Sequence, residues 1–221
     1  MQTATHKGYK GLGMEGWLAR WYTSTTGKDQ KPFRDLAQQI ASELKLGSKI
    51  LEVAPGPGFL AIELAKAGNF EITGLDISTT FVDIARANAA REGVRVDFQR
   101  GNASAIPFEH ATFDLVVCRA AFKNFSAPLE ALREMRRVLK PGGKALILDL
   151  RKDAPITTIE QHVDDMQLSA PSALFTKWTF RLLLLKRAYT YEQLAALVKQ
   201  SGFSKSRIDQ ESIGFAAWLE K

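Results

Sequence analysis

The residues best suited to chemistry lie around a glycine-rich turn in the stretch LEVAPGPGFLAIELAK. Gly56, Gly58 and Ala61 fit the spacing G-x-G-x-x-G/A, which lets the backbone turn sharply and approach a nucleotide closely. Asp76 follows 18 residues after Gly58, at the end of the next apolar segment. A carboxylate there can accept hydrogen bonds from both hydroxyls of a ribose. The pattern predicts a site for a nucleoside-containing ligand; the alternative is a turn at a helix start that binds nothing.

The segments around this turn alternate between strand-like and helix-like patterns. Pro32 can open a helix, Ser78 can cap another that runs to Arg91, and helical spacing predicts two more at 60–67 and 129–140. Apolar or alternating runs predict strands at 49–53, 70–78, 94–100, 113–118 and 145–150. This alternation is typical of the α/β class, and we predict a Rossmann-like, doubly wound and mostly parallel sheet.

The flanks of this core are interpreted as parts of one domain spanning 1–221. Thr190 and Gln193 have the spacing of a capping box, which predicts a helix near the C-terminus. The stretch 206–219 predicts two strands in an antiparallel hairpin. Residues 151–189 lack a clean period and are either a helical insertion or a lid. We expect four parts in chain order: an N-terminal cover segment (1–30), a cofactor-binding core (32–150), a lid or acceptor region (151–189), and a terminal helix and hairpin (190–221).

The composition indicates a folded protein and restricts its partners. The chain has 221 residues, of which 45% are hydrophobic, and a formal net charge of +6. The single cysteine, Cys118, excludes an intramolecular disulfide and a cysteine-based zinc cluster, and we predict no metal site. The N-terminus lacks the apolar core of a signal peptide, and the aliphatic run 182–185 is too short to span a bilayer, so we expect a cytoplasmic protein with no membrane partner. The scattered basic residues do not favour nucleic acid, and no pattern defines an oligomeric state.

Five motifs in order resemble the class I S-adenosylmethionine-dependent methyltransferases, in particular small-molecule enzymes of the ubiquinone/menaquinone-biosynthesis type. LEVAPGPG resembles the first motif, with Glu52 in its acidic position and Ala54 in place of the usual first glycine. In the family this loop passes beneath the methionine part of the cofactor. GLDIS resembles the second motif, which implies that Asp76 binds the ribose and that Ile77 lies beside the adenine.

The remaining motifs belong to the same resemblance, which covers about residues 45–150 well and the flanks loosely. GNASAIPF resembles the third motif and implies that Asn102 and Ala103 line the adenine edge. FDLVVCRAAFKNF resembles the fourth strand and the loop that leads to the acceptor, and LREMRRVLKPGG resembles a common helix-to-strand connection. The resemblance implies S-adenosyl-L-methionine as the cofactor and a small molecule as the acceptor. Tyr22 could close over the cofactor or pack against the core, and Arg119 could pair with the cofactor carboxylate or with surface acids.

Methyl transfer asks little of the protein beyond positioning, because the sulfonium already carries the reactive group. No catalytic residue therefore follows from the sequence, and the candidates are Lys123, His162 and Tyr22. Lys123-Asn124 replaces a histidine pair of many relatives, which predicts an acceptor with an anionic group unless Lys123 is an ordinary solvated lysine. Asp149 could face the site or cap the next turn. Four residues of the lid could line an apolar acceptor pocket or belong to the core: Met166, Leu168, Trp178 and Phe180.

Other functions remain open at this stage. The glycine fingerprint also fits a nicotinamide-dependent oxidoreductase, although Asn102-Ala103, the terminal hairpin and the lack of a Tyr-x-x-x-Lys pair speak against it. A cofactor-binding protein without catalysis, or an RNA or protein methyltransferase, is a further alternative. The amino-methylating enzymes of nucleic acids usually carry Asn/Asp-Pro-Pro-Tyr/Phe after the fourth strand, whereas this chain has Cys118-Arg119-Ala120-Ala121 there.

Overall fold

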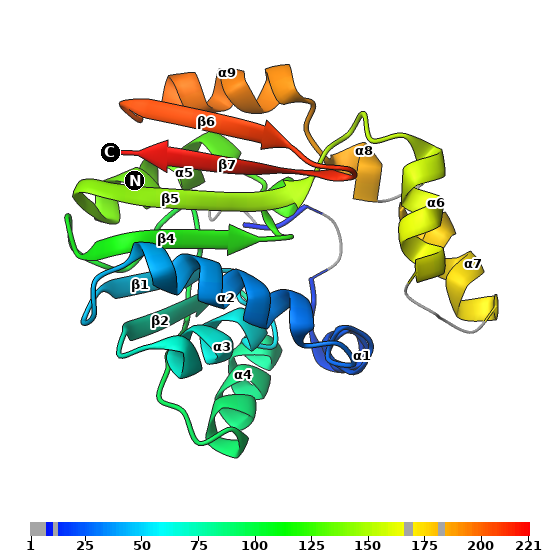
Figure 1. The fold of residues 1–221 in the computed structure, drawn as a ribbon, viewed down its shortest axis with the longest axis horizontal. Helices are drawn as coiled ribbons and strands as arrows, with labels where there is room; N and C mark the ends of the chain where they lie inside the picture. Colours follow the sequence, from blue (N-terminus) through cyan, green and yellow to red (C-terminus); the bar gives the residue numbers. More distant parts are fainter. Residues whose placement is uncertain (1–7, 11–12, 166–169, 181–183) are drawn as a thin grey trace, which may run out of the picture.

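A seven-stranded sheet forms the centre of the structure, a computed structural model that describes residues 8–10, 13–165, 170–180 and 184–221 (Figure 1). The strands are β1 (Lys49–Val53), β2 (Glu71–Asp76), β3 (Asp97–Arg100), β4 (Phe113–Arg119), β5 (Leu139–Leu150), β6 (Lys205–Gln210) and β7 (Gly214–Glu220). Their order in the sheet is β3-β2-β1-β4-β5-β7-β6. The first five are parallel, and β7 runs antiparallel to both of its neighbours. The expected Rossmann-like sheet with a terminal hairpin is confirmed.

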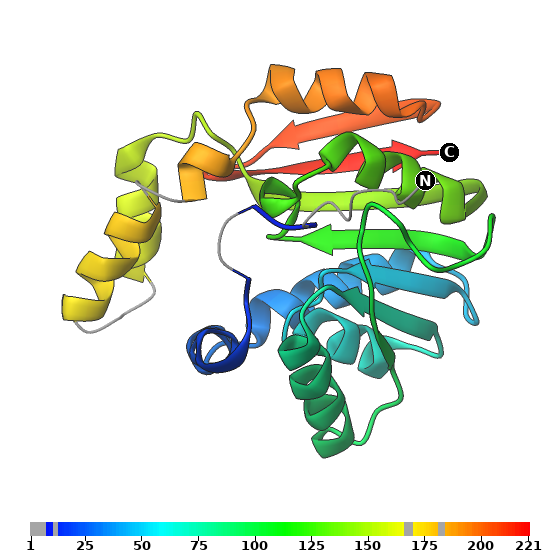
Figure 2. The ribbon, with the colours of Figure 1, turned by 180° about the vertical axis from the view of Figure 1, so that it is seen from behind.

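Helices cover both faces of this sheet (Figures 1 and 2). Buried side chains of α2 (Lys31–Glu43), α3 (Phe59–Ala67) and α4 (Thr79–Arg91) form the core on one face. Those of α5 (Pro128–Val138) and α9 (Tyr191–Ser201) form the core on the other face. The remaining helical segments are α1 (Gly16–Thr26), the short 3-10 helix η1 (Phe122–Asn124), α6 (Ile156–Asp165), α7 (Ala170–Thr179) and α8 (Leu185–Arg187).

Helix starts and stops follow local sequence signals closely. The hydroxyl of Ser78 accepts a hydrogen bond from the backbone N–H of Phe81 at 3.1 Å, which is the predicted cap of α4. Thr190 and Gln193 form both bonds of the predicted capping box at the start of α9. Gly202 ends that helix in the left-handed conformation, at φ 85°. Each of these interactions joins residues that lie close together in the sequence.

Two strands begin more than two residues from the position expected. Strand β3 begins at Asp97, because pairing with β2 starts only where Thr73 lies opposite Asp97. Strand β5 begins at Leu139 instead of residue 145, because Leu139 pairs with Phe113 before the register shifts. Both boundaries depend on the neighbouring strand and not on the local pattern.

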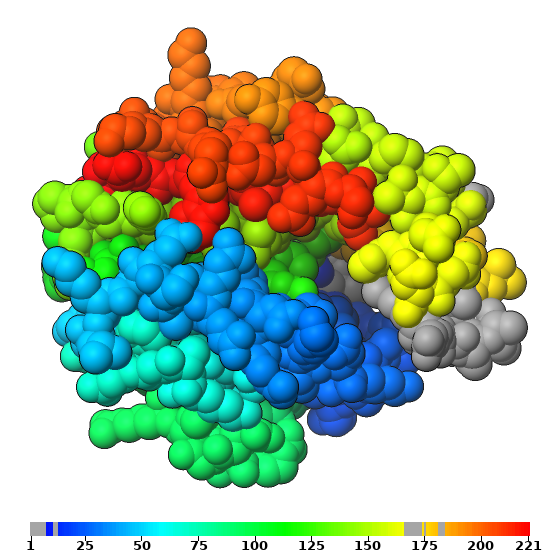
Figure 3. Space-filling model, in the orientation of Figure 1, coloured from blue at the N-terminus to red at the C-terminus, as the bar shows by residue number. Residues whose placement is uncertain are grey.

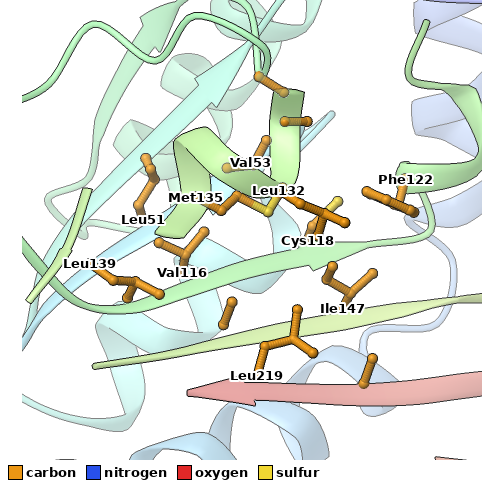
Figure 4. Close-up of a cluster of buried hydrophobic side chains, with 14 of the residues drawn as sticks. Leu51, Val53, Val116, Cys118, Phe122, Leu132, Met135, Leu139, Ile147 and Leu219 are labelled. Carbon is orange, nitrogen blue, oxygen red and sulfur yellow. The ribbon is translucent and has the colours of Figure 1, made fainter. Parts of the chain in front are cut away.

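The strands carry the candidate residues to one edge of the molecule. Figure 4 shows Leu132 and Met135 of α5 packed against Val116, Cys118 and other side chains of the sheet, which fixes the strands in place. Ligands of open α/β sheets bind at the carboxyl ends of the strands. In Figures 1 and 3, α1 and the yellow helices α6 and α7 lie at that end. In the described part of the chain, no helix is long and apolar enough to cross a membrane.

Candidate active site

The loop between β1 and α3 contains two glycines that have different physical roles. Both lie in the left-handed region, with φ 55° at Gly56 and φ 81° at Gly58. A Cβ atom at Gly58 would lie 2.7 Å from the ring of Phe98 and 2.9 Å from Cβ of Ala85, so close packing requires glycine there. A Cβ atom at Gly56 would meet no described atom within 4 Å. The loop therefore has one packed side and one open side, and Gly56 faces the open one.

Ala54 takes a conformation that its side chain disfavours. Its φ of 57° is in the left-handed region, where the resemblance places glycine in most relatives. The backbone N–H of Ala54 donates to the carbonyl oxygen of Leu75 at 2.8 Å, which holds the turn against the end of β2. The turn therefore places backbone strain at this residue.

Asp76 is buried at the end of β2 and ties the loop to helix α4. Its Oδ2 atom accepts from the N–H of Gly56 at 3.0 Å, and its Oδ1 atom accepts from the N–H of Ser78 at 2.9 Å. Burial raises the pKa of the Asp76 carboxyl to about 6, although these backbone hydrogen bonds act in the opposite direction. A carboxylate has about four acceptor positions, so Asp76 can accept further donors from a ligand.

Glu52 is a second buried carboxyl beneath the same loop. Among the described residues, none forms a hydrogen bond with its Oε2 atom, although that atom is shielded from solvent. Burial raises the pKa of Glu52 to about 8, while the N–H of Ala61 and the charge of Arg119 act to lower it. A buried oxygen without a donor is costly, so this atom is suited to a ligand that brings a donor or a positive charge.

The three residues expected at the adenine edge follow β2 and β3. Asn102 Oδ1 accepts from the N–H of Ser104 at 3.0 Å, which fixes the amide, and Ala103 is buried. Ile77 is partly exposed. A Cβ atom at Gly8 would lie 2.7 Å from both Asn102 Oδ1 and Ile77 Cδ1. The structure thus brings Asn102 and Ile77 together under Gly8, a residue that no sequence motif marks.

Tyr22 of α1 and Arg119 of β4 lie near the same edge. The Tyr22 ring packs edge-on against Phe81 of α4, with ring centroids 5.8 Å apart. Burial raises the pKa of the Tyr22 hydroxyl, and the charge of Arg119 lowers it. The guanidinium of Arg119 lies 4.3 Å from the centroid of the Phe33 ring of α2, a cation–π contact that the sequence did not predict. Tyr22 therefore packs against the core and also reaches the carboxyl edge of the sheet.

Lys123 requires a correction. Its side chain is only 4% exposed, and its Nζ atom donates to Asp149 Oδ1 at 2.7 Å and to the carbonyl oxygen of Ala120 at 2.6 Å. The backbone N–H of Lys123 donates to the other oxygen of Asp149 at 2.8 Å. Neither the solvated lysine nor the cation directed at an anionic acceptor is therefore correct, because Asp149 already neutralises this charge inside the protein. Asp149 binds the acceptor loop instead of facing an open site.

The region 151–189 contains helices where the sequence showed no period. His162, a candidate base, is exposed on α6, and that helix buries Ile159 and Val163 instead. Trp178 of α7 is exposed and Phe180 is partly buried. Two residues proposed for an acceptor pocket, Met166 and Leu168, lie outside the described residues.

The N-terminal segment supplies contacts that sequence patterns missed. The N–H of Lys10 donates to the carbonyl oxygen of Asn124 at 2.7 Å, and its Nζ atom donates to the hydroxyl of Tyr189 at 2.9 Å. Burial raises the pKa of Tyr9, and nearby Arg187 lowers it while Asp76 raises it. These residues lie in a stretch without motif or period, so the only available signal was the expectation of a cover segment over 1–30.

Comparisons with known proteins agree with this fold. The model of the family described as "Methyltransferase domain" matches residues 50–143. A demethylmenaquinone methyltransferase of Lactiplantibacillus plantarum is 30% identical over 196 residues, which cover 83% of each chain. One of Deinococcus radiodurans is 39% identical over 102 residues, which span 46% of this chain and 42% of the relative. A crystal structure from Methanococcus maripaludis superposes with a TM-score of 0.76 at 22% identity, covering 96% of this chain and 95% of that one.

The sheet order and the loop at the ends of β1 and β2 define a Rossmann-like protein of the kind that binds ligands at the carboxyl edge. The similarity to relatives over most of their length then identifies the family. The chain belongs to the class I S-adenosylmethionine-dependent methyltransferases of the ubiquinone/menaquinone-biosynthesis type.

Proposed function

We propose that this protein transfers the methyl group of S-adenosyl-L-methionine to a small-molecule acceptor at the carboxyl edge of the sheet. The observation that carries the proposal is the buried Glu52 oxygen without a partner, which lies beneath a loop whose Gly56 faces open space. The ammonium group of the cofactor can supply the donor that the Glu52 oxygen lacks. The absence of a side chain at Gly56 lets the cofactor lie directly against the backbone. The residues present therefore fit this cofactor.

Each candidate residue has a distinct role in this proposal. Asp76 would accept from the ribose hydroxyls with the lone pairs that its two backbone bonds leave free. Asn102, Ala103 and Ile77 would contact the adenine, and the backbone of Gly58 would complete the loop. Bound cofactor supplies an electrophilic methyl group on a sulfonium.

Other residues would hold the ends of the cofactor and exclude water. Glu52 would receive the amino group, and Arg119 would pair with the carboxylate while it remains stacked on Phe33. Tyr22 would cover the site from α1. The backbone of Ala54 and Gly56 would lie against the methionine part. These groups position the reactants in line, which is the main requirement for a displacement reaction.

The nature of the acceptor is proposed from relatives and from the surroundings of the site. Two relatives are named demethylmenaquinone methyltransferase, so quinones of that type are the first acceptors to screen. An anionic group on the acceptor cannot be received by Lys123, because Asp149 holds it. We propose that Arg187, which lies near Tyr9, binds such an anionic group instead.

The test is a calorimetric titration of the purified protein with S-adenosylmethionine, S-adenosylhomocysteine and NADH. We expect micromolar binding of the two sulfur nucleosides and no heat from NADH. Binding of NADH alone would keep the fold but replace the methyltransferase with the oxidoreductase. Methyl transfer is then measured with labelled cofactor and demethylmenaquinone, with labelled RNA as the control acceptor. Transfer to RNA alone would contradict the small-molecule acceptor.

A further inference from the structure

Glu15 makes an unusual contact between distant parts of the chain. It precedes α1 directly, yet its carboxylate lies at the start of α4 and accepts from the N–H groups of Thr79 and Thr80, both at 3.0 Å. The first N–H groups of a helix have no partner within the helix, and the positive end of the helix dipole favours an anion. Glu15 thus provides acceptor oxygens for the start of α4 from a position 64 residues before Thr79, whereas a side chain close in sequence usually provides them.

Two more hydrogen bonds strengthen this contact. The hydroxyl of Ser78 donates to the carbonyl oxygen of Met14 at 2.6 Å, and the N–H of Gly16 donates to the hydroxyl of Thr80 at 3.0 Å. Residues 14–16 are therefore joined to residues 78–80 by four hydrogen bonds, which we call the Glu15 contact. Because Ser78 also donates its N–H to Asp76, the Glu15 contact is only one hydrogen bond away from the proposed ribose carboxylate.

The Glu15 contact connects the start of α1 to the start of α4. In Figure 2, α1 (dark blue) lies to the left of α4 (green), and the two helices are in contact. Further along α1, Tyr22 packs on Phe81 of α4, and beyond its end a Cβ atom at Gly27 would lie 3.0 Å from the ring of Phe59. In the first turn of the same helix, Trp17 is exposed and the small side chain of Ala19 is buried. The polar contact made by Glu15 thus joins the start of α1 to α4, and the packing of Tyr22 on Phe81 joins the next turn.

We infer that Glu15 is a positioning residue of the cofactor site, which holds α1 against α4 and so keeps Tyr22 over the edge where Asp76 lies. The inference rests on the proposed binding of S-adenosylmethionine. Glu15 itself need not touch the cofactor. A glutamate that only capped α4 would affect stability and leave cofactor affinity unchanged, whereas a positioning residue affects affinity in the folded protein.

The test compares Glu15→Ala and Glu15→Gln with Glu92→Ala. Glu92 is a matched control, because it is a carboxylate beyond the other end of α4 that pairs with Lys66 at 2.9 Å. Calorimetry measures the Kd of S-adenosylmethionine, and hydrogen exchange reports on the amides of α1, α4 and the central strands. We expect about a tenfold higher Kd for Glu15→Ala, an intermediate value for Glu15→Gln, which keeps one acceptor oxygen, and no change for Glu92→Ala.

Hydrogen exchange separates positioning from general stability. In Glu15→Ala, the amides of Thr79, Thr80 and α1 should exchange faster while those of β1 and β4 keep their protection. Faster exchange of these amides with an unchanged Kd would overturn the inference, since the position of α1 and Tyr22 would then not affect binding. If Glu15→Ala does not fold, Glu15→Gln decides, and a Kd equal to the wild-type value overturns the inference. A wild-type protein that does not bind S-adenosylmethionine would refute the proposed function itself.

Discussion

The buried pair of Lys123 and Asp149 allows the sharpest prediction. Substitution Lys123→Met removes the ammonium group and leaves a carboxylate that is only 1% exposed. Its remaining donors are the backbone N–H groups of Lys123 and Leu150, at 2.8 and 2.7 Å. Removing one partner of a buried ion pair costs about 3–5 kcal/mol. Since domains are stable by about 5–15 kcal/mol, we expect a large loss of stability.

The assay is urea unfolding followed by tryptophan fluorescence, with a thermal melt as a second measurement. For a chain of this size, a loss of about 3–5 kcal/mol corresponds to a fall in Tm of roughly 6–20 °C. The double variant Lys123→Met/Asp149→Asn should recover part of the loss, because it leaves no buried charge unpaired. The recovery stays partial, because an amide has one acceptor oxygen, whereas the backbone N–H groups of Lys123 and Leu150 bond to different oxygens of Asp149. The control Lys140→Met breaks a pair with Asp114 that is 39% and 31% exposed, and should cost about 1 kcal/mol or less.

A specific result would refute this reasoning. If Lys123→Met lowers the free energy of unfolding by no more than Lys140→Met does and instead impairs only the use of the acceptor, Lys123 is available to the substrate. The sequence-based interpretation of Lys123 would then be correct, and the ion pair with Asp149 would not be its role.

Three further predictions concern the loop and its carboxyls. Asp76→Ala should weaken S-adenosylmethionine binding by about 1.5–3 kcal/mol in calorimetry, because charged hydrogen bonds to the ribose are lost. The control Asp35→Ala, at an exposed carboxylate, should leave binding unchanged. Equal Kd values for the two variants would remove Asp76 from the site. Ala54→Gly should stabilise the protein by about 0.5 kcal/mol in urea unfolding. Relief of about 1–2 kcal/mol of left-handed strain exceeds the entropy cost of glycine, which is about 0.5–1 kcal/mol. A loss of stability would show that the packing of the Ala54 methyl group outweighs the relief of strain. The pKa of Glu52 is raised to about 8 in the folded protein, from an ordinary value of 4.5. Between these two pH values the folded state holds a proton that the unfolded state has lost, so the stability of the ligand-free protein should fall as pH rises from about 5 to 8. Urea midpoints across this range should show the fall in the wild type and a smaller one in Glu52→Gln; identical slopes would contradict the assignment.

Sequence reasoning succeeded where a few neighbouring residues decide the structure. The left-handed turn at Gly56 and Gly58, the cap at Ser78 and the capping box at Thr190 all depend on conformations or bonds within about four residues. It was less successful at the ends of β3 and β5, which depend on the register of a neighbouring strand. In 151–189 it left a helical insertion and a lid as alternatives and could not place individual helices, because no apolar period marks them.

The sequence by itself determined the class of fold, the family and the position of the glycine-rich loop, because these follow from local spacing and motif order. Only the tertiary structure decided what the charged residues do. Lys123 meets Asp149 because η1 follows β4, and β4 and β5 end side by side. Glu15 meets Thr79 across 64 residues of chain. Such contacts depend on how strands and helices are brought together in space. The sequence alone does not indicate whether a charged side chain will be buried, paired or exposed.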